Sequence, residues 1–273
     1  MKTNADIRPL KEEEIEVVKT FVPAEWHFDL GQFMHSNFHE PFFKAFACYD
    51  KGQVTGTGNV IVNGEVGWLG NIIIEPSHRS NGLGFQLTRY LVEYLKTQGC
   101  KSQILIATEA GKPMYQKLGF LTTSVYCFLK GGRIPVAPDM SYIRPIIPED
   151  IPALRQLDKT ASGEDRFHLV EKNLNNAWIY TSDKNNIPEG FYLPSFGNGL
   201  IVASNPQAGL KLLHLKHYRY DQVAVLPCDN KIATEFLKHF HFKEYLLSPR
   251  MVLGEEVEWR PEMIFSRAAG YCG

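Results

Sequence analysis

The hydrophobic pattern of the chain predicts a buried strand that leads directly into an amphipathic helix. Three consecutive β-branched residues, Ile72 to Ile74, are typical of a buried strand, and Pro76 ends it. Apolar residues then recur three and four positions apart, at Leu83, Leu87, Tyr90, Leu91, Tyr94 and Leu95. This spacing places one apolar and one polar face on a helix that ends near Gly99.

The same pattern predicts alternating strands and helices along the rest of the chain. Further strands are expected at residues 42–49, 53–62, 65–74, 102–107, 121–130, 191–194, 200–203, 222–226 and 244–253. Helices are expected at residues 112–118, 207–217 and 231–240, with another that opens at Gly163. Asn63-Gly64 predicts a type I′ hairpin turn, and Gly56 and Gly58 are expected to be bulge or close-packing glycines.

The turn between the central strand and its helix is a candidate phosphate site. Its sequence is Arg79-Ser-Asn-Gly82-Leu-Gly84. The first N–H groups of a helix lack intrahelical partners and carry partial positive charge, and glycines let a phosphate approach the backbone. The pattern is neither Gly-x-Gly-x-x-Gly nor a P-loop, and a Gly-x-Gly pair also occurs in tight turns without a ligand. Both interpretations stay open on this turn alone.

Two motifs together resemble those of the GNAT superfamily of N-acetyltransferases. Arg79-x-x-Gly82-x-Gly84 after an apolar strand is similar to its acetyl-CoA pyrophosphate loop. Tyr115-x-x-x-Gly119-Phe120 is similar to its second landmark, at the end of a short helix. The motifs stand in the family's order, and the resemblance covers roughly residues 5–130. It implies an α/β fold with a mixed sheet, and acetyl-CoA as co-substrate.

The resemblance also implies roles for particular residues. The pantetheine arm would lie along the backbone of Ile72, Ile73 and Ile74, which would polarise the thioester oxygen. The pyrophosphate would bind the N–H groups of the loop residues Arg79, Ser80, Asn81, Gly82, Leu83 and Gly84. Tyr115 would be the general acid, because a phenol with a pKa near 10 keeps its proton at neutral pH. Tyr115 and the isoleucines would equally serve as core residues.

The general base is not assigned by the sequence. An amine must lose its proton before it can attack, often through water. The candidates are Glu65, Asn71, His27, Asp29, His35 and Glu109. Each of them would equally be a solvated or helix-capping residue.

No sequence pattern predicts a metal site. His35-x-x-x-His39 has helical spacing but lacks the adjacent Glu of His-Glu-x-x-His. The five cysteines are scattered and never form Cys-x-x-Cys: Cys48, Cys100, Cys127, Cys228 and Cys272. They indicate a reduced, cytoplasmic protein with incidental thiols. Cys228 has no identifiable histidine partner, so a cysteine nucleophile is not predicted either.

The charge and hydropathy of the chain bear on whether its partner is a nucleic acid, a membrane or a small molecule. Charged residues make up 22% of the chain and the net charge is −1, so no basic footprint for nucleic acid or an anionic membrane is present. No apolar segment approaches membrane-spanning length, and no targeting segment is expected after Met1. A small-molecule amine acceptor is the expected partner, and the oligomeric state stays open.

The second half of the chain resembles a degenerate repeat of the first. A length of 273 residues suggests two domains, and glycine and proline are dense over residues 131–141, as in a linker. Ile143-Arg-Pro and the helix after it echo Ile7-Arg-Pro and its helix. We therefore predict an acetyltransferase domain at 1–130, a linker at 131–141 and a degenerate GNAT-like domain at 142–273.

The predicted second domain lacks the residues that would bind and use the coenzyme. Residues 204–209, Ser-Asn-Pro-Gln-Ala-Gly, stand where the phosphate loop would be, and Pro206 removes a backbone donor. Leu237 stands opposite Tyr115, and His241 stands opposite Gly119. We expect one acetyl-CoA per chain, with the second domain either lining the acceptor pocket or only stabilising the first.

Two classes of function follow from the sequence. The first is an N-acetyltransferase that moves the acetyl group of acetyl-CoA to a small primary amine by direct attack in a ternary complex. The alternative is a non-catalytic module that binds or senses acetyl-CoA. Tyr115 favours the enzyme, and the lack of an assigned base favours the module.

Overall fold

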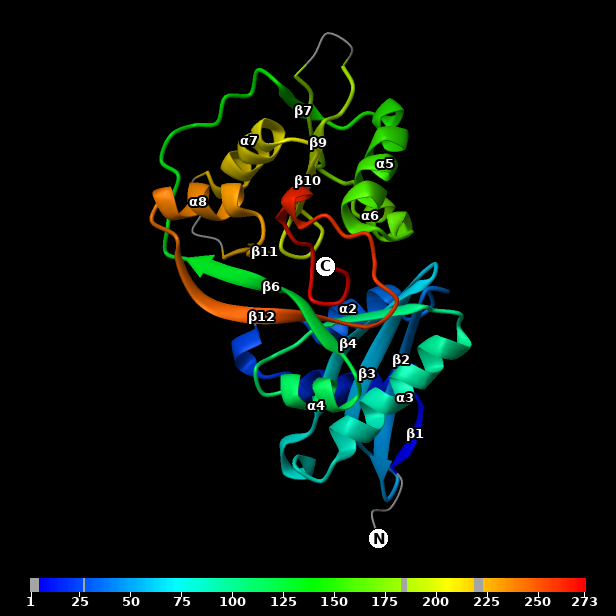
Figure 1. Ribbon diagram of the computed structural model, residues 1–273. Coiled ribbons are helices and arrows are strands. Elements are labelled where there is room, and N and C mark those ends of the chain that lie inside the picture. Colours follow the sequence, from blue (N-terminus) through cyan, green and yellow to red (C-terminus); the bar gives the residue numbers. More distant parts are fainter. Residues whose placement is uncertain (1–4, 27, 183–185, 219–222) are drawn as a thin grey trace. The chain divides into compact units, whose positions relative to one another are not determined.

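The computed structural model describes residues 5–26, 28–182, 186–218 and 223–273, and the chain divides into two compact units (Figure 1). The first unit comprises Met1–Leu121 and Val252–Glu255, and the second comprises Thr122–Met251 and Glu256–Gly273. The division after residue 121 places the strand at 121–130 almost wholly in the second unit, whereas the sequence analysis assigned it to the first domain.

The first unit contains a mixed sheet, as the resemblance implied. Its strands lie in chain order and are β1 (Asp6–Pro9), β2 (Phe43–Asp50), β3 (Gln53–Asn63), β4 (Val66–Ile74) and β5 (Ser102–Ile106). The first four pair antiparallel, and β5 joins β4 in parallel. The return from β4 to a parallel neighbour requires a crossover, and the long helix after β4 provides it.

Four helices accompany this sheet: α1 (Ile15–Val18), α2 (Leu30–Asn37), α3 (Leu83–Thr97) and α4 (Lys112–Lys117). Short 3-10 turns lie at Glu12–Glu14, Lys19–Phe21, Ala24–Trp26 and Pro76–His78. The predicted apolar face of α3 is buried through Leu87, Leu91 and Leu95, and α3 lies across one face of the strands (Figure 1). Gly58 permits this packing, because a Cβ there would lie 2.9 Å from Leu91 Cδ1.

The turn between β3 and β4 differs from the sequence prediction in its type. Asn63 pairs with Val66, so Gly64 and Glu65 are the two loop residues. Only Gly64 of this pair has a positive φ, of 64°. A single positive φ at the first position is the pattern of a type II′ turn, whereas type I′ needs two.

The second unit contains two groups of strands. β7 (Ile143–Pro145), β8 (Trp178–Tyr180), β9 (Gly190–Leu193), β10 (Leu200–Ala203) and β13 (Ile264–Ser266) form a five-stranded sheet. In the other group, β12 (Lys243–Gly254), β6 (Leu121–Lys130) and β11 (Ala224–Pro227) lie side by side in that order. The short strands β8 and β13 were not predicted. Residues 244–253 were expected to form the final strand of the chain, but β13 follows them.

The helices of the second unit are α5 (Ile151–Ser162), α6 (Phe167–Glu171), α7 (Pro206–His217) and α8 (Lys231–His239). Single 3-10 turns lie at Pro148–Asp150 and Pro261–Met263. Gly163 has a φ of 72° and ends α5 instead of opening the next helix, which begins at Phe167. A left-handed residue after a helix is the usual glycine stop, so the prediction at Gly163 had the wrong direction.

The last strand, β13, occupies a distinctive place in the second unit. It pairs antiparallel with β10, and the N–H of Arg267 directly after it donates to Val225 O of β11 at 2.9 Å. Phe265 of β13 contacts Gly209 on α7, where a Cβ would overlap its ring. β13 therefore lies between β10 and β11, whereas β4 and β5 are direct neighbours in the first unit.

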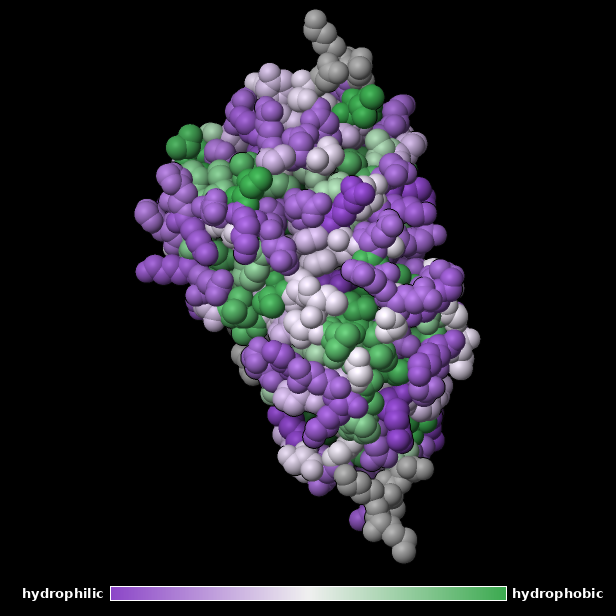
Figure 2. Space-filling view, viewed as in Figure 1, coloured by the Kyte–Doolittle hydropathy of each residue, from purple (hydrophilic) through white to green (hydrophobic). Residues whose placement is uncertain are grey.

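None of the helices in the described ranges combines the length and apolar character needed to cross a bilayer. The face shown in Figure 2 is largely hydrophilic, with smaller apolar areas between polar side chains.

Candidate functional site

The strands β4 and β5 are paired over only part of their length. Val66 to Trp68 pair with Ser102 to Ile104, and in the described chain this ladder continues no further. β4 runs on through Leu69–Ile74. The backbone groups on that edge of β4 are therefore placed to bind an extended ligand between the diverging strands.

A β-bulge lies in β4 three residues beyond its last pair with β5. The pairing of β3 with β4 shifts register between Thr57 and Asn59, opposite Asn71 and its neighbours. Asn71 has a left-handed φ of 51°, and its Nδ2 donates to Asn59 Oδ1 at 2.7 Å. A bulge bends its strand and increases the local twist, which re-aims the residues after it. The bulge thus explains why residues 72–74 diverge from β5.

The three predicted isoleucines follow the bulge. Ile73 is buried, and Ile72 and Ile74 are partly exposed. Gly56 faces them across the ladder, where a Cβ would lie 2.5 Å from Ile74 Cδ1 and 3.1 Å from Ile73 O. Gly56 is thus a close-packing glycine, as predicted.

The loop after β4 is held by hydrogen bonds from its own side chains. Arg79 Nε donates to Ile74 O, the last carbonyl of the strand, at 3.0 Å. Glu75 accepts bonds from the Ser77 hydroxyl and backbone N–H and contacts His78 Nδ1. The hydroxyl bond, followed by that to His78, lowers the pKa of Glu75 to about 2. The Arg79 side chain therefore shapes the loop rather than pointing freely to solvent.

The N-terminus of α3 has the features of an anion site. Gly82 is its N-cap, with a φ of 80°, and provides no side chain to cap the helix. The N–H groups of Leu83, Gly84 and Phe85 belong to the first turn, which lacks intrahelical acceptors. A Cβ built on Gly82 meets no atom within 4 Å. The approach to these donors is consequently open.

Met114 links the loop to the second motif. A Cβ on Gly84 would lie 3.5 Å from Met114 Sδ and 3.7 Å from Ile74 Cγ1. The strand end, the start of α3 and the short helix α4 therefore meet around Gly84. The sequence analysis did not single out Met114, and its position next to Tyr115 was the only signal that could have identified it.

The Tyr115 motif forms a Schellman helix end. Gly119 has a φ of 94°, its N–H donates to Gln116 O at 3.0 Å, and the Phe120 N–H donates to Tyr115 O at 3.1 Å. The rings of Tyr115 and Phe120 meet edge to face at 6.0 Å, which is the hydrophobic contact expected of this motif. The spacing Tyr-x-x-x-Gly-Phe is thus explained by the helix end alone, and the tyrosine hydroxyl remains to be accounted for.

That hydroxyl retains its proton. Tyr115 is 9% exposed, and burial raises its pKa to about 12. No hydrogen bond to the hydroxyl is found among the residues that the structure describes. A protonated phenol without a fixed partner can donate to a ligand atom, as a general acid must.

Three of the candidate bases have other partners. Glu65 lies in the turn just before β4, at the opposite end of that strand from Ile74, and pairs with Lys101 Nζ at 2.6 Å. Asp29 caps α2 by accepting from Gln32 N at 2.8 Å. His35 lies on α2, with Nε2 3.6 Å from Glu16. Asp29 thus has the helix-capping role that was the alternative to catalysis, and Glu65 and His35 contact charged neighbours at the surface.

The three remaining candidate bases lie in different parts of the chain, and none is established as a base. Asn71 lies at the bulge beside the diverging strands, and its amide is not a base at neutral pH. Glu109 is exposed in the turn that follows β5. His27 lies outside the described residues. The geometry therefore brings the loop, the isoleucines and Tyr115 together and does not select a base.

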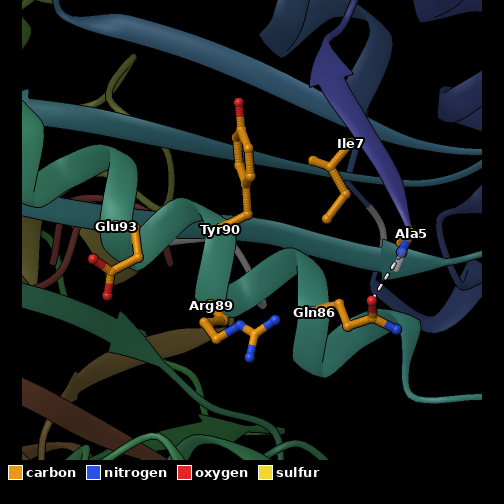
Figure 3. Close-up of a pocket in the computed structure, with 6 residues that line it drawn as sticks. All are labelled: Ala5, Ile7, Gln86, Arg89, Tyr90 and Glu93. Carbon is orange, nitrogen blue, oxygen red and sulfur yellow. Dashed lines mark hydrogen bonds between the residues drawn. The ribbon is translucent and has the colours of Figure 1, made fainter. Parts of the chain in front are cut away.

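A shallow hollow of about 280 Å³ lies elsewhere on the first unit. It is formed by β1 and the outer side of α3, where Gln86 Oε1 accepts from Ala5 N at 2.8 Å (Figure 3). Arg89, Tyr90 and Glu93 complete its wall. None of the predicted site residues lines it, so we do not assign the coenzyme to this hollow.

Comparison with known proteins agrees with the resemblance read from the motifs. Residues 10–120 match the model of the acetyltransferase (GNAT) family. Over 84 residues the chain is 31% identical to glucosamine 6-phosphate N-acetyltransferase of Trypanosoma brucei brucei, covering 28% of this chain and 57% of that protein. Over 78 residues it is 36% identical to the uncharacterized N-acetyltransferase YobR of Bacillus subtilis (strain 168), covering 28% of this chain and 32% of that protein. The chain thus spans about half or less of these relatives.

A solved structure shares the fold over nearly the whole chain. It is a putative acetyltransferase from Pyrococcus horikoshii, with a TM-score of 0.83 at 21% identity, covering 99% of this chain and 96% of that one. At this identity the likeness concerns the fold alone. It confirms the predicted mixed α/β architecture.

Proposed function

We propose that the chain is an acetyl-CoA-dependent N-acetyltransferase whose acceptor is a small primary amine. Residues 10–120 match the model of the acetyltransferase (GNAT) family. The observation that carries this proposal is the convergence at Gly84 of three elements: the unpaired edge of β4, the uncapped start of α3 and the helix that bears Tyr115. Each element supplies something that acetyl transfer needs.

The residues of the first unit fit the coenzyme chemically. The first-turn N–H groups of α3 and the open space at Gly82 suit a pyrophosphate, because the donors face a region without a Cβ. The edge of β4 at residues 72–74 is not paired with β5 and suits the amide groups of a pantetheine arm, as an added strand would; on this stretch Ile74 O already accepts from Arg79 Nε. Acetyl-CoA would supply the activated acetyl group as a thioester.

Transfer requires one bond to form and one to break. The neutral amine nitrogen attacks the thioester carbon, the carbon–sulfur bond breaks, the nitrogen loses a proton and the sulfur gains one. A backbone N–H of β4 would stabilise the negative charge that develops on the thioester oxygen. Tyr115 would donate the proton that the sulfur needs, because its raised pKa keeps it protonated. Holding both reactants in place would supply much of the remaining rate.

The acceptor is proposed at the level of its class. The Trypanosoma relative is named for glucosamine 6-phosphate, an amine carried on a phosphosugar. The match covers 28% of this chain, so that compound is a first substrate to test rather than an assignment. Direct attack in a ternary complex fits the proposed site, because no described residue of it is a cysteine nucleophile.

The number of coenzyme sites follows from the second unit. β13 separates β10 from β11, so the gap that corresponds to the one between β4 and β5 is filled by the chain itself. Pro206 is the first residue of α7 and offers no N–H. These two observations support one acetyl-CoA per chain. They are compatible with a degenerate second GNAT-like domain at residues 142–273.

Release of free thiol from acetyl-CoA tests the proposal. The full chain should release thiol only in the presence of an accepted amine, across a panel of amino sugars and their phosphates, polyamines, amino acids and peptides. The alternative function, a non-catalytic binding or sensing module, is favoured by the engagement of Glu65, Asp29 and His35 elsewhere. Binding of acetyl-CoA without thiol release for any amine would support that alternative.

A further inference from the structure

Three metal-ligating side chains converge in the second unit. They are Cys127 on β6, Cys228 directly after β11 and Glu244 on β12. The two Sγ atoms and a carboxylate oxygen all lie within 4.8 Å of one another. The strand order β12, β6, β11 explains this meeting of residues that are far apart in the sequence (Figure 1).

The backbone fixes the two sulfurs in place. Leu226 of β11 is the ladder partner of Cys127, and the N–H of Cys228 donates to Val125 O at 2.8 Å. Cys127 Sγ also lies 3.5 Å from Leu226 O. Both thiols are therefore held against each other before any ligand binds.

Access and ligand type both suit an ion from solution. Cys127 is buried, Cys228 is partly exposed and Glu244 is exposed, so the group opens to solvent on one side. Three groups that carry like charge when ionised need a cation to coexist in that state. Two sulfurs exclude the hard ions Mg²⁺ and Ca²⁺ and favour a borderline ion such as Zn²⁺.

We propose that Cys127, Cys228 and Glu244 bind one Zn²⁺ ion, with a water molecule as the fourth ligand. Around a tetrahedral Zn²⁺ with Zn–S of about 2.3 Å and Zn–O of about 2.1 Å, ligand atoms lie about 3.6–3.8 Å apart. The ligand atoms now lie within 4.8 Å of one another and would have to come about 1 Å closer to bind the ion. The ion would join three adjacent strands of the second unit, whereas the residues proposed for acetyl transfer belong to the first unit.

Metal titration of the reduced, chelator-treated full chain tests this site. Co²⁺ should bind with one equivalent and give a thiolate-to-cobalt charge-transfer absorption in the near ultraviolet, and Zn²⁺ should displace it. Cys228→Ser should abolish the absorption. Glu244→Gln changes an exposed residue, so it should fold normally and weaken Zn²⁺ binding at least about tenfold, since even outer-shell partners contribute that much. Zn²⁺ should also raise the Tm of the unaltered chain.

Cys100→Ser is the matched control, because Cys100 is a buried thiol outside the cluster. It should leave Co²⁺ and Zn²⁺ binding unchanged. The proposal fails if the unaltered chain shows no charge-transfer absorption, or if the absorption persists in Cys228→Ser. It also fails if Glu244→Gln binds Zn²⁺ as tightly as the unaltered chain. A disulfide between Cys127 and Cys228, found by peptide mapping of the unreduced chain, would overturn it as well.

Discussion

Tyr115 combines a structural and a proposed chemical role, and the two can be separated. Its ring packs on Phe120 at the end of α4, where the Schellman hydrogen bonds need an apolar pair. Its hydroxyl makes no hydrogen bond within the described part of the chain. The hydroxyl can therefore be removed without disturbing the helix end.

Tyr115→Phe should fold normally, bind acetyl-CoA almost as tightly as the unaltered chain, and lose at least about tenfold in kcat. The ring and its contact with Phe120 remain, while the proton donor for the departing sulfur is gone. Steady-state thiol release and a calorimetric Kd measure the two effects. An unchanged kcat would reduce Tyr115 to a packing residue.

The rate of acetyl transfer should rise with pH and then stay level. Deprotonation of the amine raises the rate, because only the neutral amine attacks. Burial raises the pKa of Tyr115 to about 12, so the phenol keeps its proton and no falling limb should begin below about pH 10. A kcat profile measured from about pH 6 to 10 checks this. A fall centred near pH 8 to 9 would mean that a more acidic group donates the proton.

Gly82→Val should abolish acetyl-CoA binding in a folded chain. The new side chain would project into the open space through which a phosphate reaches the first N–H groups of α3. Gly52→Val is the matched control, because Gly52 has a φ of 82° and equally open surroundings but lies in the turn after β2. Both variants carry the same backbone strain of about 1–2 kcal/mol. Equal calorimetric Kd values for the two variants would place the coenzyme elsewhere.

Helix ends are the elements in which the two halves of the chain agree most closely. Gly119 after α4 and His241 after α8 both have positive φ, and in each case the next residue donates back to the residue three places inside the helix end. Leu237 takes the place of Tyr115 in that bond, and Phe242 takes the place of Phe120. This is the correspondence that the sequence predicted. The cap persists in the second unit without the tyrosine.

His241→Gly should stabilise the second unit by about 0.5–1 kcal/mol. His241 has a φ of 66°, and the strain of about 1–2 kcal/mol that this imposes exceeds the entropy cost of glycine in the unfolded chain. Urea unfolding would measure the change. His239→Gly, at the last helical residue, should instead destabilise by up to about 1 kcal/mol. If both variants lost stability, the left-handed turn would not be strained.

Elements with strong periodicity could be predicted from the sequence, and elements fixed by distant partners could not. Residues 121–130 and 200–203 form the predicted strands with the predicted bounds. β8 and β13 have three residues each, too few for a period, and they exist because neighbouring strands pair with them. The type II′ turn was missed because Asn63-Gly64 suits the centre of a type I′ turn, whereas the chain uses Gly64 as the first central residue of a Gly-x turn one position later.

In the candidate site too, features formed by contiguous residues could be predicted from the sequence, and features formed by distant residues could not. The loop Arg79–Gly84 could be identified from its motif, because its residues are contiguous and glycine is required there. The meeting of Gly84 with Met114, and that of Cys127 with Cys228 and Glu244, depend on how strands and helices pack. No spacing rule along the chain could have predicted them.

For the chain as a whole, the claim on which the account depends is a single acetyl-CoA site built by the first unit. β13 fills the corresponding gap of the second unit, and Pro206 removes a donor from the start of α7. Calorimetric titration of the full chain with acetyl-CoA measures the number of sites directly. We expect one molecule bound per chain, with all binding lost in Gly82→Val. Two equivalent sites per chain, or one site that persists in Gly82→Val, would contradict it.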